Sequence, residues 1–96
     1  MIDETARISS KAIIGKNVSI GPWTIVGPDV VVGEGSEIGS HVVLKGPTVL
    51  GPRVKVFQFS TVGDGTPALA YDGESTSLEI GEGTVIREGV TIHRGT

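Results

Sequence analysis

The sequence predicts a single all-β domain, a parallel β-helix built from six-residue repeats, and three observations lead to this fold class. An aliphatic residue recurs at every sixth position along almost the whole chain. Glycine directly follows that residue in eight of the repeats, and the chain contains 15 glycines in 96 residues. Only four residues are aromatic. A helix of 3.6 residues per turn does not return to the same face after six residues, whereas a short strand followed by a glycine corner does.

The aliphatic positions mark the predicted short strands in chain order. They are Ile2, Ile8, Ile14, Ile20, Val26, Val32, Ile38, Leu44, Leu50, Val56 and Val62, and then Ile80, Ile86 and Ile92. All 14 are aliphatic, although only 27 of the 96 residues are Ile, Leu or Val. The residue four places after each of them is small or β-branched, as at Thr24, Ser36 and Ser60. Because side chains alternate along a strand, both positions point to the same side, which we expect to be the core.

Three repeats form one triangular coil of about 18 residues, and stacked coils form a solenoid. We therefore predict about five coils over residues 1–96, with three aliphatic columns inside. The predicted columns are Ile2, Ile20, Ile38, Val56 and Ile92; Ile8, Val26, Leu44, Val62 and Ile80; and Ile14, Val32, Leu50 and Ile86. Such a narrow core leaves no room for many aromatic side chains.

The repeat is interrupted once, at about residues 64–78. The in-frame positions there are Ala68 and Glu74, and an unpaired glutamate is not expected inside an apolar column. The segment is rich in Gly, Pro, Asp and Ser. It is predicted to be a loop expelled from the prism, with Ile80 resuming one coil after Val62. Inserted loops of solenoids often border a binding face, and the alternative interpretation is an irregular surface loop.

Composition excludes several classes of protein. The absence of cysteine excludes disulfides, a thiolate zinc site and a cysteine nucleophile. No apolar run is long enough to span a membrane, and the first residues lack the pattern of a signal peptide. A net charge of −3 with both signs scattered along the chain does not favour nucleic-acid binding.

The candidate catalytic chemistry is sparse. Only His41 and His93 could act as a base near neutral pH, and they belong to different coils and are not expected to share a metal ion. Ser36 and Ser60 take inward positions, so neither is a candidate nucleophile. We therefore assign no catalytic residue, no metal and no cofactor from the residues alone.

Four stretches resemble one enzyme family. They are residues 20–28 (IGPWTIVGP), 40–48 (SHVVLKGPT), 57–63 (FQFSTVG) and, most specifically, 86–96 (IREGVTIHRGT). The chain resembles the N-terminal β-helix of the bacterial acyl-carrier-protein–UDP-N-acetylglucosamine O-acyltransferases. The resemblance implies a left-handed coil and a cytoplasmic homotrimer that acts in lipid A synthesis, with active sites between subunits. It also implies transfer of a hydroxyacyl chain from acyl carrier protein to the sugar 3-hydroxyl, with a histidine as general base.

Two departures from that family pattern shape the expected function. The sequence ends at Thr96, before the family's catalytic histidine, its last coils and its helical C-terminal domain. Where the family usually has Asp-Leu-Lys-Tyr, residues 68–71 read Ala-Leu-Ala-Tyr. By resemblance, the residues on the substrate side are Ala68, Ala70, Tyr71 and His93.

We accordingly expect a catalytically silent, engineered fragment that assembles as a trimer, stacks end to end through its C-terminal coil, or does both. It is not expected to bind UDP-N-acetylglucosamine or acyl carrier protein productively. The alternatives are an active acyltransferase, or another trimeric hexapeptide protein such as a sugar acetyltransferase or a carbonic-anhydrase-like enzyme with a three-histidine zinc site.

Overall fold

The computed structural model describes residues 1–65 and 76–94, which contain thirteen short strands in three parallel sheets. One sheet has the order β1 (Arg7–Ile8), β4 (Ile25–Val26), β7 (Val43–Leu44), β10 (Thr61–Asp64) and β13 (Thr91–His93). The second has the order β11 (Leu78–Ile80), β8 (Thr48–Leu50), β5 (Val30–Val32) and β2 (Ile13–Ile14). The third has the order β12 (Val85–Ile86), β9 (Lys55–Val56), β6 (Glu37–Ile38) and β3 (Ser19–Ile20).

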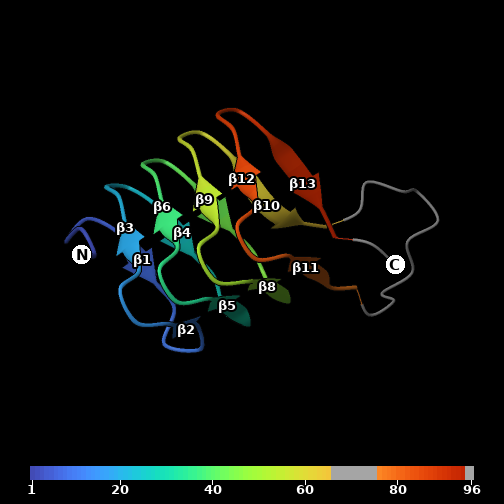
Figure 1. Ribbon diagram of the computed structural model, residues 1–96, viewed down its shortest axis with the longest axis horizontal. Coiled ribbons are helices and arrows are strands. Elements are labelled where there is room, and N and C mark those ends of the chain that lie inside the picture. Colours follow the sequence, from blue (N-terminus) through green and yellow to red (C-terminus); the bar gives the residue numbers. More distant parts are fainter. Residues whose placement is uncertain (66–75, 95–96) are drawn as a thin grey trace.

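Consecutive strands belong to three different sheets, so the chain winds around a prism with one sheet on each face (Figure 1). Parallel partners are one full coil apart: Arg7 pairs with Ile25, and Ile25 with Val43, a step of 18 residues. A bridge between Ile2 and Ile20 extends the third sheet toward the N-terminus. The predicted all-β hexapeptide β-helix is thus confirmed. No helix among the described residues is long and apolar enough to cross a membrane.

The predicted columns are correct up to Val62 and wrong after it. Ile80 pairs with Leu50 and does not continue the column of Val62. Ile86 likewise pairs with Val56, and Ile92 with Val62. Each of these steps is 30 residues, because the segment between β10 and β11 adds residues at one corner and replaces no face of the coil. The predicted columns assume instead that the loop takes the place of a whole coil.

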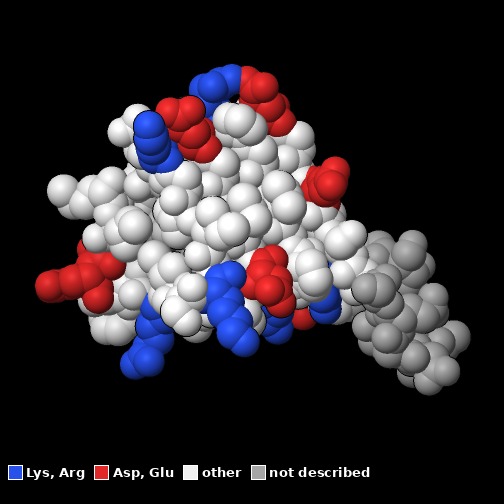
Figure 2. Space-filling view, turned by 90° about the horizontal axis from the view of Figure 1, so that it is seen from below, with Lys and Arg blue, Asp and Glu red and all other residues white. Residues whose placement is uncertain are grey.

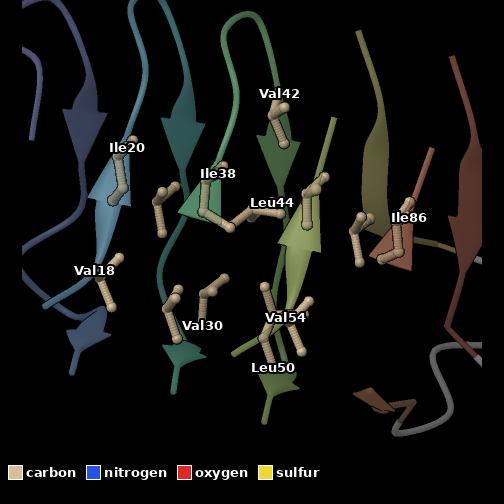
Figure 3. Close-up of a cluster of buried hydrophobic side chains, with 13 residues drawn as sticks. Val18, Ile20, Val30, Ile38, Val42, Leu44, Leu50, Val54 and Ile86 are labelled. Carbon is tan, nitrogen blue, oxygen red and sulfur yellow. The ribbon is translucent and has the colours of Figure 1, made fainter. Parts of the chain in front are cut away.

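The core consists of columns of stacked aliphatic side chains inside the prism, as the repeat predicts. Figure 3 shows these side chains on neighbouring strands, including Ile20, Ile38 and Ile86 of the same sheet. The buried apolar residues are Val18, Ile20, Val26, Val30, Val32, Ile38, Val42, Leu44, Leu50, Val54, Val56, Val62 and Ile86. Trp23 and Phe59 lie outside the core and are 62% and 65% exposed. The narrow prism excludes these aromatic rings, as expected.

Hydroxyl groups at the predicted inward small-residue positions are buried and hydrogen-bonded. The Thr24 hydroxyl donates to the Gly39 carbonyl at 2.7 Å and accepts the Val42 N–H at 3.1 Å. The Ser36 and Ser60 hydroxyls each make the same pair of hydrogen bonds, one donated and one accepted, at other corners. A buried hydroxyl is tolerated when its donor and acceptor are both satisfied, so these side chains join neighbouring coils without disturbing the core.

The corners use glycine for two physical reasons. At Gly33 a side chain would overlap the backbone of Gly51 and Pro52 in the next coil, so glycine permits the close stacking of coils. Gly63 combines such crowding with a backbone φ of 89°, a conformation that favours glycine. Several corners nevertheless place non-glycine residues in the left-handed region. They are Asn17, Trp23, Asp29, His41, Arg53 and Phe59.

Candidate functional site

The candidate site is built around His93, the predicted substrate-side residue that the structure describes. His93 ends β13 on the last part of the solenoid, at the corner where the chain also leaves β10. The other three predicted residues, Ala68, Ala70 and Tyr71, lie outside the described residues. The geometry of the site therefore concerns the groups that surround His93.

A β-bulge brings Asp64 beside His93. Val62 pairs with Ile92, and Asp64 then pairs with His93, so Gly63 is the extra residue of β10. A bulge of this kind bends the strand and redirects the side chains that follow it. A side chain at Gly63 would strike the Lys45 carbonyl and the Thr48 hydroxyl. Glycine thus allows the bulge that places Asp64 and His93 together.

The imidazole of His93 is held by a backbone carbonyl. Its Nδ1 lies 3.0 Å from the Gly65 oxygen. A carbonyl oxygen can only accept a hydrogen bond, so Nδ1 must donate, and in the neutral ring Nε2 is the nitrogen with the free lone pair. His93 as a whole is exposed.

Asp64 forms an ion pair with the preceding coil. Its Oδ1 lies 3.2 Å from Nζ of Lys45 and also accepts the Gly65 N–H at 3.0 Å. The hydrogen bond from Lys45, followed by the Gly65 amide and the charge of Lys45, lowers the pKa of Asp64 below its ordinary value. Asp64 is therefore a carboxylate at neutral pH and is poorly suited to act as a proton donor.

Arg94 ties the end of β13 to a corner two coils away. Its backbone N–H donates to the Asp64 carbonyl at 2.8 Å, and its Nη1 donates to the Gly46 carbonyl at 2.7 Å. Its buried Nε has no hydrogen-bond partner within residues 1–65 and 76–94. The Gly46–Pro47 peptide at that corner is cis. Arg94 thus acts as a positioning group for the corner.

The nitrogen-bearing side chains of this corner are engaged by oxygen atoms of the protein itself. Lys45 contacts Asp64, Arg94 contacts Gly46, and His93 contacts Gly65. The arrangement can fix the corner and present one imidazole nitrogen. Sequence reasoning missed Lys45 and Arg94, although both lie in the stretches that carry the family resemblance, because only the fold reveals that residues 45, 64 and 94 meet.

The second histidine lies elsewhere and takes no part in the site. His41 lies at the corner between β6 and β7, where its ring packs against Phe59 with centroids 5.2 Å apart. Within the described part of the chain, no group of three or more His, Cys, Asp or Glu side chains could hold a metal ion.

An open groove of about 290 Å³ lies on a different face, over β3, β6 and β9. Its lining includes Phe57, which stacks under the Arg87 guanidinium at 4.2 Å. Glu37 and Lys55, which form a 3.7 Å ion pair, lie beside it. His93 does not line this groove.

Comparison with known proteins gives one consistent picture. Residues 11–46 match the family model of the bacterial transferase hexapeptide, six repeats. The acyl-[acyl-carrier-protein]–UDP-N-acetylglucosamine O-acyltransferase of Saccharophagus degradans is 53% identical over 95 residues, which cover 99% of this chain and 37% of the relative. The protein of that name from Stutzerimonas stutzeri is 56% identical over 96 residues, 100% of this chain and 37% of the relative.

The solved structures agree. LpxA from Acinetobacter baumannii superimposes with a TM-score of 0.96 and 46% identity, over 99% of this chain and 37% of that one. The UDP-N-acetylglucosamine acyltransferase of Francisella novicida superimposes with a TM-score of 0.95 and 36% identity, over 100% and 35%. The chain therefore spans a little over a third of the length of the relatives it matches.

Proposed function

We propose that the chain supplies the β-helix that borders the acyl-transfer site of an enzyme. The premise is that it belongs to the acyl-[acyl-carrier-protein]–UDP-N-acetylglucosamine O-acyltransferase family, whose hexapeptide-repeat β-helix it shares. The reaction in question would move a hydroxyacyl chain from acyl carrier protein to UDP-N-acetylglucosamine. In this proposal the 96-residue chain on its own is a silent scaffold.

The engagement of the corner's cations supports the scaffold role. A base for acyl transfer must lie within hydrogen-bond reach of the attacking hydroxyl, in a site that holds the substrate. The charged groups around His93 instead contact oxygen atoms of the protein: Lys45 the Asp64 carboxylate and Arg94 the Gly46 carbonyl. His93 is exposed, and it does not line the groove over β3, β6 and β9.

An acyl-transfer assay of the folded chain with hydroxyacyl carrier protein and UDP-N-acetylglucosamine tests this proposal. We expect no turnover above that of the heat-denatured protein. Turnover that disappears in a His93→Ala variant would instead assign activity to this chain, with His93 as its base. Circular dichroism of both proteins confirms that the comparison is made between folded chains.

We also propose that the chain assembles as a homotrimer through the corner that carries Trp23, His41 and Phe59, here called the aromatic corner. These three side chains are exposed and occupy the same position in successive coils, each with a positive φ. Exposed Trp and Phe are enriched where proteins associate. Sedimentation equilibrium should give a trimer that Trp23→Ala and Phe59→Ala weaken and that Val85→Ala, an exposed apolar change on another face, leaves intact. A trimer unaffected by both aromatic changes would refute this assignment.

A further inference from the structure

A different face, formed by β2, β5, β8 and β11, presents an apolar strip to solvent. Its outward residues stand in register, with Ile13 beside Val31, Val31 beside Val49 and Val49 beside Glu79. Ile13 is 64% exposed and Val49 is 42% exposed. Figure 2 views the molecule from the side on which these strands lie in Figure 1, and it shows a broad uncharged band bordered by charged side chains. We call this surface the valine face.

The charges along one border of the valine face alternate in sign from coil to coil. The corner that follows the face carries Lys16, Glu34, Arg53 and Glu82 in successive coils. The Gly35 N–H bonds to the Lys16 carbonyl, and the Arg53 N–H to that of Glu34, so these corners stack directly on one another. The Arg53 guanidinium contacts the Glu82 carboxylate.

The opposite border follows the same rule. The corner that precedes the valine face carries Lys11, Asp29 and Lys45 in the first three coils, and Asp64 ends β10 beside this corner in the fourth. Lys45 and Asp64 form an ion pair, and the Asp29 N–H bonds to the Lys11 carbonyl. Both borders are therefore positive in the first and third coils and negative in the second and fourth.

This pattern discriminates between the two ways in which a second copy can lie face to face on the first. A two-fold axis along the solenoid places each coil against the same coil of its partner, so every border brings like charges together. A two-fold axis along the strands places the first coil against the fourth and the second against the third. Every border position then meets the opposite charge, and like-charge juxtaposition is avoided throughout.

We propose that the valine face docks a second copy of this chain in the antiparallel orientation. Val31 of each copy packs against Val49 of the other at the centre of the interface. Glu34 of each copy lies opposite Arg53 of the other, and Asp29 opposite Lys45. At the two ends of the interface Ile13 meets Glu79, whose carboxylate stays at the solvent edge. This association goes beyond the proposed function and does not depend on it.

The size of the face sets the strength of this association. The face is four coils long at the inter-strand spacing, and it is as wide as one strand with its corners. It therefore covers on the order of 300–400 Å² of each copy. Stable complexes bury about 800 Å² per partner. The face-to-face dimer is therefore weak and forms at high protein concentration, with its orientation selected by charge.

Reciprocal charge reversal tests the proposal directly. In Glu34→Lys the new lysine faces Arg53 of the partner twice, and in Arg53→Glu the new glutamate faces Glu34 twice. We expect each variant alone to dimerise at least tenfold more weakly than the wild type in sedimentation equilibrium, equivalent to about 1.4 kcal/mol. An equimolar mixture should regain the association, because the introduced lysine of one chain then faces the introduced glutamate of the other. The unchanged Arg53 and Glu34 of the two chains also face each other.

Two controls keep the result specific. Glu37→Lys reverses an exposed charge on another face, beside Lys55, and should leave the association unchanged. Thermal melts of all variants confirm that they fold. The aromatic corner lies across the prism from the valine face, so any oligomer formed through it persists in the Glu34 and Arg53 variants. Three results would each overturn the proposal. The wild type could show no concentration-dependent association, each variant could associate as strongly as the wild type, or the mixture could associate no more strongly than the single variants.

Cross-linking gives an independent measure of orientation, because the unsubstituted chain contains no cysteine. A mixture of Val31→Cys and Val49→Cys chains should form a mixed disulfide dimer under mild oxidation, faster than either variant alone. Faster linkage of Val31→Cys to itself would indicate the parallel arrangement and contradict the inference.

Discussion

The buried hydroxyl of Ser36 links two coils, and its removal should destabilise the protein far more than its size suggests. The hydroxyl donates to the Gly51 carbonyl at 3.1 Å and accepts the Val54 N–H at 3.1 Å, and Ser36 is 0% exposed. Ser36→Ala removes a single oxygen atom and leaves almost no cavity. It also leaves the buried Val54 N–H unsatisfied, while the Gly51 carbonyl is partly open to solvent.

A buried polar group without a partner costs about 1–3 kcal/mol, so the expected loss in the free energy of unfolding is about 2–3 kcal/mol. For a domain of this size, each kcal/mol lowers the melting temperature by about 4–8 °C. The matched control is Thr84→Ala, because the exposed Thr84 hydroxyl donates to the Gly81 carbonyl at 2.8 Å. This change should cost less than about 0.5 kcal/mol.

Urea unfolding followed by circular dichroism measures both variants under the same conditions. If Ser36→Ala and Thr84→Ala lose the same amount, or if Ser36→Ala loses less than about 0.5 kcal/mol, the hydroxyl bridge is not a stabilising element. The hydroxyls of Thr24 and Ser60, which join neighbouring coils by the same pair of hydrogen bonds, would then not be stabilising either.

Three further predictions concern the bulge and its neighbours. Gly63→Ala should lower the free energy of unfolding by at least about 3 kcal/mol, because its side chain meets backbone at a positive φ, whereas Gly81→Ala, with open space around it, should be close to neutral in the same urea titration. The Asp64 carboxyl should titrate below its ordinary value of 3.8 by NMR, and its ion pair with Lys45 should stabilise the fold above that pH and be lost as the pH falls through the lowered value. A midpoint at or above 3.8 in the folded protein would contradict the ion pair. Nitrogen NMR of neutral His93 should show a protonated Nδ1 and a bare Nε2, and the reverse tautomer would rule out the bond to the Gly65 carbonyl.

The repeat in the sequence is enough to predict the prism, because six-residue spacing is a local property of the chain. It places Ile20 and Ile38 in one column and Thr24 and Ser36 in the interior, and the structure has them there. The predicted columns after the interruption are wrong, because the number of residues in an expelled loop carries no information about the face to which the chain returns. Pairing of Leu50 with Ile80 depends on where β11 re-enters.

The candidate site is harder to predict from the sequence than the fold is. The family resemblance of residues 86–96 identifies His93. The groups that surround His93 come from residues 45 to 65, and only the bulge at Gly63 brings them beside it. Lys45 and Arg94 look like ordinary surface charges in the sequence. The alternation of charge along the valine face is likewise hidden, because Glu34 and Arg53 become neighbours only when the coils stack.

The 30-residue step across the interruption has a consequence for how such a protein can change. Strands before and after it stack on one another, since Leu78 and Ile80 pair with Thr48 and Leu50 in the same unbroken register in which Val30 and Val32 pair with Thr48 and Leu50. The corner between β10 and β11 is therefore a site at which residues can be inserted without altering the register of the stacked strands. Doubling the length of a flexible loop costs only about 0.6 kcal/mol in closure entropy. Foreign peptides inserted between Gly65 and Leu78 should therefore be displayed on a scaffold that keeps its shape.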